Sequence, residues 1–144
     1  MSSVTIVREV RGSAEAAYHA FTDVAVLRRW WWPQLPDTTY LVDPVVGGEL
    51  RVTSATAGIG FRGTFSLLDP PKRLAFSFIW MTDGADALVD GELIVDEVEV
   101  TFEPLPNGTT RVNVVHTSVE EINDSEGVGL GWNDVMDRLA TLDL

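Results

Sequence analysis

The sequence contains no cysteine, which excludes disulfides, thiolate nucleophiles and cysteine-based zinc sites. Lysine is almost as scarce, because Lys72 is the only lysine among 10 basic residues, which face 22 acidic residues and give a formal net charge of -12. A chain this acidic repels phosphate backbones and anionic lipid, so neither nucleic acid nor a membrane surface is an expected partner. With two histidines and no ligand spacing between histidine and carboxylate, no metal site is expected either.

Long apolar runs are also missing, since Arg, Asp or Gly interrupts each run before the roughly 20 residues that a membrane helix needs. The opening segment, MSSVTIVREVRG, lacks a cleavable signal pattern, and a cytosolic location is therefore the expectation. The rest of the composition, with 45% hydrophobic and 22% charged residues, is typical of a globular protein, and no repeat or linker divides it. We expect a single ligand-binding domain over residues 1–144.

The first quarter of the chain predicts a strand and two short helices. Residues 4–10 alternate in hydrophobicity as a strand does. Ser13 is placed to cap a helix whose apolar stripe follows at helical spacing, at Ala14, Ala17, Tyr18 and Phe21. Asp23 is placed to cap a second helix, which is expected to carry the tryptophans at 30–32 and to stop at Pro33.

From residue 38 onward the period changes to strict alternation, in short runs separated by Gly, Pro and Asn-Gly turns, which predicts an antiparallel meander. The strand before the Asn107-Gly108 turn is expected to be wet on one side, because glutamates alternate with apolar residues along it. The residues expected to share a face within each strand are Leu50 and Val52; Phe61, Phe65 and Leu67; Leu74, Phe76, Phe78 and Trp80; Val98, Val100 and Phe102; and Val112, Val114 and His116.

The end of the chain returns to a helical period, with a helix expected from about Ser125 to Leu142. Its apolar seam consists of Val128, Trp132, Val135, Leu139 and Leu142. Three glycines, at 127, 129 and 131, weaken its start by about 1 kcal/mol each relative to alanine. Strands that are dry on one face, together with one long amphipathic helix, predict an α+β fold in which a curved antiparallel sheet wraps the C-terminal helix.

Several segments carry a family resemblance in matching order and spacing: REVRGSAEAAYHAFTDVAVLRRWWWP, VGGELRV, GTFSLLDPPKRLAFSFIW, VEVTFEPLPNGTTRVNVVHTS and GWNDVMDRL. They resemble the START-like helix-grip superfamily of polyketide cyclases and plant lipid-binding allergens, in its branch of homologues of the heat-shock-protein ATPase activator. The resemblance implies the helix-grip fold over nearly the whole chain. It does not decide the chemistry, because this scaffold carries transporters of ligands, sensors, cyclases, hydrolases and co-chaperones. The chain departs from the family pattern at Val24, where Pro is frequent, and at Trp32, where Gly is frequent.

Aromatic residues from many of the expected elements converge on the face between sheet and helix, which favours a pocket for a small apolar or aromatic molecule. No Gly-rich phosphate loop or nucleophile elbow is present, so no cofactor is expected and no catalytic residue is assigned. The residues expected to line the pocket are Trp30, Trp31, Phe61, Phe65, Phe76, Phe78, Trp80, Val98, Val100, His116, Trp132 and Met136.

Three polar residues leave other functions open. His116 is in phase with the inward residues of its strand and can serve either as a base or as a core histidine bonded to a backbone carbonyl. Asp96 points inward on an unbroken strand and outward after a bulge, and Arg8 either binds an acidic group or reaches water. An enzyme of cyclase, aromatase or hydrolytic type stays open. So do a homodimer and a chaperone-interaction module that would use an exposed patch at Trp30–Trp32.

Overall fold

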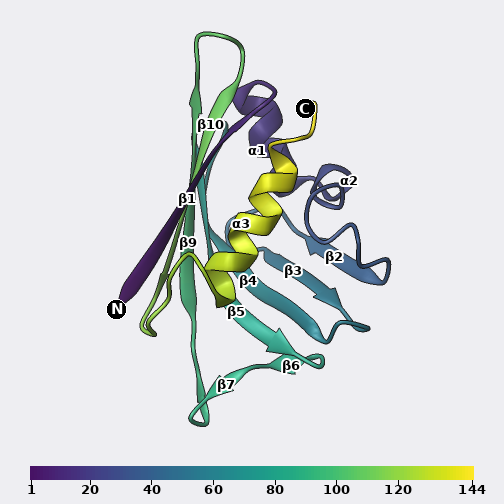
Figure 1. Cartoon of the computed structure of the whole chain (residues 1–144), viewed down its shortest axis with the longest axis vertical. Helices are drawn as coiled ribbons and strands as arrows, with labels where there is room; N and C mark the ends of the chain where they lie inside the picture. Colours follow the sequence, from purple (N-terminus) through teal and green to yellow (C-terminus); the bar gives the residue numbers. More distant parts are fainter.

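One large antiparallel sheet, a small two-stranded hairpin and three helices make up the protein, which is seen in a computed structural model describing all 144 residues (Figure 1). The sheet contains β1 (Ser2–Val10), β2 (Thr38–Val42), β3 (Glu49–Ser54), β4 (Ile59–Asp69), β5 (Arg73–Thr82), β6 (Ala85–Asp86), β9 (Asp96–Pro104) and β10 (Thr110–Ser118). Its strands pair in the order β1-β10-β9-β5-β4-β3-β2, with β6 paired to β5. The two remaining strands, β7 (Leu88–Val89) and β8 (Glu92–Leu93), form a separate hairpin.

The helices lie at one face of this sheet. After β1 the chain forms α1 (Ala14–Thr22) and α2 (Val24–Leu27), and it ends with α3 (Gly127–Leu139). In Figure 1 the yellow α3 crosses in front of the sheet, and it packs against β1. The predicted α+β helix-grip fold is thus confirmed. None of the helices has the length and the apolar content needed to cross a membrane.

Both predicted caps of the short helices are present. The Ser13 hydroxyl accepts a hydrogen bond from the Ala16 amide at 3.1 Å, and the Asp23 carboxylate accepts one from the Ala25 amide at 3.0 Å. Each cap satisfies a backbone N–H that the first turn of a helix leaves free. The cap at Asp23 explains why α1 ends and α2 begins at this residue.

The tryptophan run is not helical, contrary to the sequence prediction, because α2 ends at Leu27. All three indoles are buried, and Trp32 has a φ of 54°, in the left-handed region. Consecutive residues of a helix point about 100° apart, so a helix cannot bury three successive indoles against one core. The turn that replaces it allows all three side chains to pack inward.

The alternating faces of the strands are confirmed with one exception. A β-bulge in β4 shifts the register between Phe65 and Leu67, so Leu68 rather than Leu67 packs against the core. A bulge adds one residue to one strand and reverses the side on which the following side chains point. Trp80, at the far end of the β5 face, is 37% exposed.

The closing helix is shorter than predicted but keeps its apolar seam. Trp132, Val135 and Leu139 are buried, while Val128 and the post-helical Leu142 pack partly buried against the core. Gly129 sits where an added Cβ would lie 1.7 Å from the carbonyl oxygen of Asn123, so a larger residue would clash with the loop that precedes α3. This glycine therefore brings the loop and the helix together.

Candidate ligand-binding groove

A polar chain of three side chains crosses the core beneath α3. The Trp132 indole N–H donates to Nδ1 of His116 at 2.9 Å, and Nε2 of His116 lies 2.8 Å from Oδ2 of Asp96. His116 is fully buried on β10, where it stands opposite Val98 of β9. The register of β9 thus brings Asp96, at the first position of the strand, within reach of the imidazole.

These contacts determine the tautomer of His116. An indole nitrogen can only donate, so Nδ1 of His116 must accept and carries no proton in this arrangement. The proton of the neutral ring is therefore on Nε2, which donates to the Asp96 carboxylate. His116 is a core histidine satisfied on both nitrogens, and its partners are two side chains, not the backbone carbonyl of the core-histidine alternative. Asp96 points inward although β9 begins at this residue.

Two neighbouring hollows lie beside this chain of hydrogen bonds, and together they are called the α3 groove. An inner chamber of about 40 Å³ adjoins an outer chamber of about 330 Å³. The groove is bordered by Trp31, Trp32, Phe78, Trp80, Asp96, Gly127, Val128, Gly131, Trp132 and Val135. Both chambers share Phe78, Trp80, Gly127 and Val128, so they lie next to each other. The outer volume is near the lower limit of typical ligand pockets, about 300 Å³.

Only part of the expected pocket wall borders this groove, namely Trp31, Phe78, Trp80 and Trp132. The other residues of that set are buried in the core, where they fill the space between sheet and helix: Trp30, Phe61, Phe65, Phe76, Val98, Val100, His116 and Met136. Phe61 stacks on Phe78 with ring centres 4.6 Å apart, and Trp31 meets Trp132 edge to face at 5.0 Å. Because these rings are large and close-packed, the hollow remains only at the N-terminal end of α3.

Two buried side-chain polar atoms of the protein have no hydrogen-bond partner, and both belong to residues that border the groove. They are Nε1 of Trp31 and Oδ1 of Asp96. Leaving a buried donor or acceptor unsatisfied costs about 1–3 kcal/mol, and almost all such groups in proteins are paired. Behind the apolar wall of the groove there is thus one unused donor and one unused acceptor, and both atoms are themselves buried.

Backbone strain is found at the same place. Trp32 borders the inner chamber in a left-handed conformation that costs a non-glycine residue about 1–2 kcal/mol. Its ring lies edge to face with that of Trp80, with centres 6.3 Å apart. Trp32, where the family frequently has glycine, thus narrows the groove with its indole ring.

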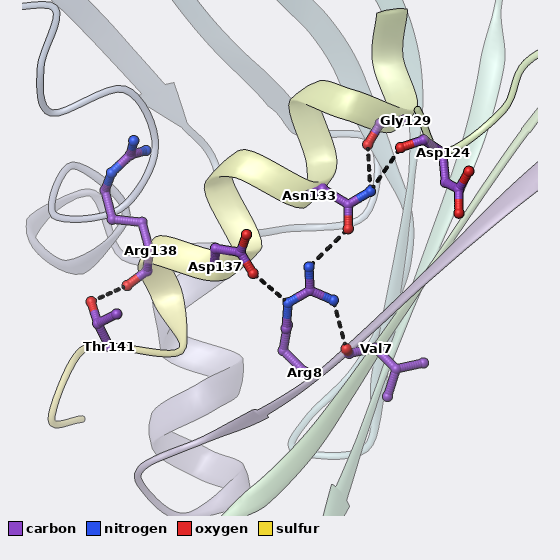
Figure 2. A network of polar contacts seen from close by, with 8 residues as sticks. All are labelled: Val7, Arg8, Asp124, Gly129, Asn133, Asp137, Arg138 and Thr141. Carbon is purple, nitrogen blue, oxygen red and sulfur yellow. Dashed lines mark hydrogen bonds and ion pairs between the residues drawn. The ribbon is translucent and has the colours of Figure 1, made fainter. Parts of the chain in front are cut away.

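Arg8 does not border the groove and instead ties β1 to α3 (Figure 2). Its Nε donates to Asp137 at 2.7 Å and its Nη2 to the Asn133 side chain at 2.8 Å. Asn133 in turn donates to the carbonyl oxygens of Asp124 and Gly129 (Figure 2). The network holds the start of α3 and its preceding loop against β1, and the acidic group that Arg8 binds is a protein side chain.

Six groove residues lie outside the expected pocket wall: Trp32, Asp96, Gly127, Val128, Gly131 and Val135. For Asp96 an inward direction was one of two open alternatives, and Trp32 was expected only in an exposed patch. Val128 and Val135 belong to the predicted seam, which could have placed them there. The glycines had no such signal, because their part in the groove comes from the bare backbone of the first helical turns.

No group of three or more His, Asp or Glu side chains is placed to hold a metal ion.

A curved sheet gripping a C-terminal helix, with a hydrophobic groove between them, defines a helix-grip domain. Residues 11–142 match the family model described as "Activator of Hsp90 ATPase homolog 1-like protein", and the chain belongs to this family. The family is generally associated with the binding of hydrophobic ligands. None of the curated proteins matches the sequence significantly.

Solved structures share the fold over 95% or more of the chain. Protein CV1439 from Chromobacterium violaceum is 23% identical with a TM-score of 0.74, covering 99% of this chain and 97% of its own. An Aha1 from Colwellia psychrerythraea, solved as a dimer, is 20% identical with a TM-score of 0.74 and 98% coverage of both chains. PFC0360w, an HSP90 activator from Plasmodium falciparum, is 21% identical with a TM-score of 0.67, covering 95% of this chain and 92% of its own.

Proposed function

We propose that the protein is a single-domain binding protein for a small apolar or aromatic molecule, which it holds in the α3 groove. The observation that carries this proposal is the coincidence of an aromatic-walled hollow with the two unpaired buried polar atoms, on Trp31 and Asp96. A flat apolar ligand would cover the exposed part of Trp80, and a small rotation of the Trp31 or Asp96 side chain would bring its buried, unpaired atom to a polar group of the ligand.

The groove limits the size of the ligand. The inner chamber, at about 40 Å³, admits a functional group or a water molecule, and the outer chamber of about 330 Å³ admits one or two fused rings. A larger ligand would require Trp32 to move. Its strained backbone favours such a movement, because release from the left-handed conformation offsets part of the lost packing.

Titration with 1-naphthylmethanol, followed by amide NMR, tests the proposal. The expected shifts concentrate at Trp80, Gly127 and Gly131. Gly131 borders the groove, and an added Cβ would meet no atom within 4 Å, so Gly131→Leu should fill the space and weaken binding tenfold or more. The control is Leu130→Ala, which removes an exposed side chain of the same helix turn outside the groove. Shifts elsewhere, or equal affinity of Gly131→Leu and wild type, would contradict the proposal.

An enzyme that uses His116 as a base receives little support from the hydrogen bonds. Both nitrogens are engaged, and accepting a proton at Nδ1 would break the bond from Trp132. General-base catalysis needs a free nitrogen within hydrogen-bond reach of the substrate. Binding without proton transfer at His116 is therefore the version that we favour.

A protein contact is the second candidate, but not through the tryptophan run, which is buried. One exposed apolar segment is the β7–β8 hairpin with its flanks, which presents Leu88, Val89, Leu93 and Val95; β7 lies at one end of the molecule in Figure 1. Because a structural neighbour covering 98% of this chain was solved as a dimer, we propose a second copy of this chain as the occupant. Sedimentation should show a dimer that Leu88→Ser with Leu93→Ser dissociates. A monomeric wild type at high micromolar concentration would contradict it.

A further inference from the structure

The charge inside the α3 groove restricts the ligand further than its shape does. Asp96 is the only residue with an ionisable side chain among those that border the groove. Its side chain is 14% exposed, and the only basic residue within ion-pair distance is His116. Since the proton of His116 sits on Nε2 and Nδ1 accepts from Trp132, the ring is neutral and leaves the carboxylate without a compensating cation.

The N-terminus of α3 brings a partial positive charge to the same hollow as this carboxylate. Gly127 and Val128, at the first turn of α3, border the outer chamber together with Asp96, and no side chain caps the helix. The dipole of a helix amounts to about half an elementary charge at its N-terminus, which is less than the full charge of a carboxylate. The groove therefore stays negative, within a protein whose formal net charge is -12.

The rings beside Asp96 are suited to a cation. Asp96 pairs with Phe78 across the β5–β9 ladder, and Phe78 stacks with Trp80 at 6.2 Å. The faces of indole and benzene rings attract ammonium groups, and this attraction grows when the cation is partly desolvated. Oδ1 of Asp96 has no partner and is itself buried, so a small rotation of this side chain, which is 14% exposed, would let it accept a charge-assisted hydrogen bond from a protonated amine in the outer chamber.

We propose that the α3 groove selects flat apolar molecules that carry a protonated amine, with Asp96 as the residue that determines this specificity. The proposal rests on the proposed binding function and adds the chemical class of the ligand to it. Asp96 binds the ammonium group, Phe78 and Trp80 cover the apolar rings, and the His116–Trp132 pair holds the carboxylate in position.

Three probes with the same ring system test it: 1-naphthylmethylamine, 1-naphthylmethanol and 1-naphthoic acid, each titrated into the wild-type protein at neutral pH. The amine should bind tenfold or more tightly than the alcohol, and the acid should bind most weakly. In Asp96→Asn the amide oxygen can still accept from Nε2 of His116, so the fold is preserved while the charge is lost. The preference for the amine over the alcohol should then fall below threefold.

The matched control is Glu97→Gln, which removes the same charge from the next residue of β9, on the exposed side of the strand. It should keep the full preference for the amine. If both variants lose the preference equally, the net charge of the protein and not Asp96 selects the ligand, and the proposal fails. The proposal also fails if the wild type binds the amine and the alcohol with equal affinity, or binds the acid more tightly than the amine, while the amide shifts remain at residues of the groove. In that case the binding function still stands. If none of the probes shifts groove residues, the binding function itself is overturned.

Discussion

His116 shows how far single residues could be interpreted from sequence. Its inward direction follows from strand parity with Val112 and Val114, and this prediction is confirmed by its complete burial. Its partners do not follow, because Asp96 is 20 residues away in sequence and Trp132 is 16. They meet through the pairing of β9 with β10 and the docking of α3, and neither distance has a signature in the sequence.

The tautomer of His116 is a direct prediction of this geometry. Long-range ¹H–¹⁵N correlation should show a protonated Nε2 and an unprotonated Nδ1 at neutral pH, because Trp132 can only donate. Trp132→Phe removes that donor and serves as the comparison. In this variant Nδ1 no longer has to accept a hydrogen bond, so it can carry the proton of the ring. A proton on Nδ1 in the wild type would be incompatible with the hydrogen bond from Trp132 to this nitrogen.

Trp132 should be the most costly single replacement in α3. It is buried, contacts Trp31 edge to face and donates to His116. Trp132→Ala is expected to lower the free energy of unfolding by about 3–5 kcal/mol through lost packing, and Trp132→Phe by about 1–3 kcal/mol, because Nδ1 of His116 is left unsatisfied. Urea denaturation measures both. An unchanged midpoint for Trp132→Ala would show that the seam does not hold the helix to the sheet.

At the scale of elements, the periodicities predicted which segments form strands and helices, and tertiary packing decided their ends. The helix expected over 125–142 is Gly127–Leu139, and the expected tryptophan helix is one turn followed by an irregular segment. The bulge in β4 moved Leu67 off the face of Phe65. A bulge and a non-helical tryptophan run both depend on what the chain packs against, so local patterns could not show them.

The glycines of α3 provide a matched pair of variants. Gly131→Ala should raise the free energy of unfolding by up to about 1 kcal/mol, because a Cβ there meets no atom within 4 Å and alanine favours the helix. Gly129→Ala should lower it by about 1–3 kcal/mol, because its Cβ would overlap the Asn123 carbonyl. Thermal or chemical denaturation separates the two. If both variants were stabilising, the contact between the loop and α3 would be absent in solution.

At the scale of the molecule, the negative charge predicts weak interactions with polyanions. The 22 acidic residues outnumber the 10 basic ones, and several of the arginines are held in ion pairs, for example Arg62 with Asp86 and Arg111 with Glu103. We expect no binding to duplex DNA by fluorescence anisotropy at low salt. Binding whose affinity fell steeply as salt increased would reveal a basic surface and contradict this prediction.

Acid should destabilise the protein through a few carboxylates that the fold keeps ionised. Hydrogen bonds from Thr56, and then from Ser54, hold the pKa of the Asp37 carboxyl below its usual value of 3.8. Thr109, and then Asn107, lower the pKa of Glu9 in the same way, and the hydrogen bonds from Arg62 lower the pKa of Asp86. A pKa that is lower in the folded state means that the unfolded chain binds protons first. The stabilisation is therefore complete above the unfolded pKa, near 4, and is lost as the pH falls from there through the folded pKa.

Repulsion among the negative charges predicts the opposite trend, a gain in stability as the pH falls from neutral. Urea denaturation over a range of pH separates the two effects. With a sequence pI of about 4.3, protonation from neutral pH downward removes negative charge and should stabilise the fold until the depressed carboxyls begin to titrate. Urea midpoints should thus be level or rising down to about pH 4 and fall below it. Asp37→Asn should flatten that fall, since its amide cannot be protonated, whereas Glu121→Gln at an exposed site should leave it unchanged. If Asp37→Asn followed the wild-type curve, the bonds to Asp37 would contribute nothing to the acid dependence of stability.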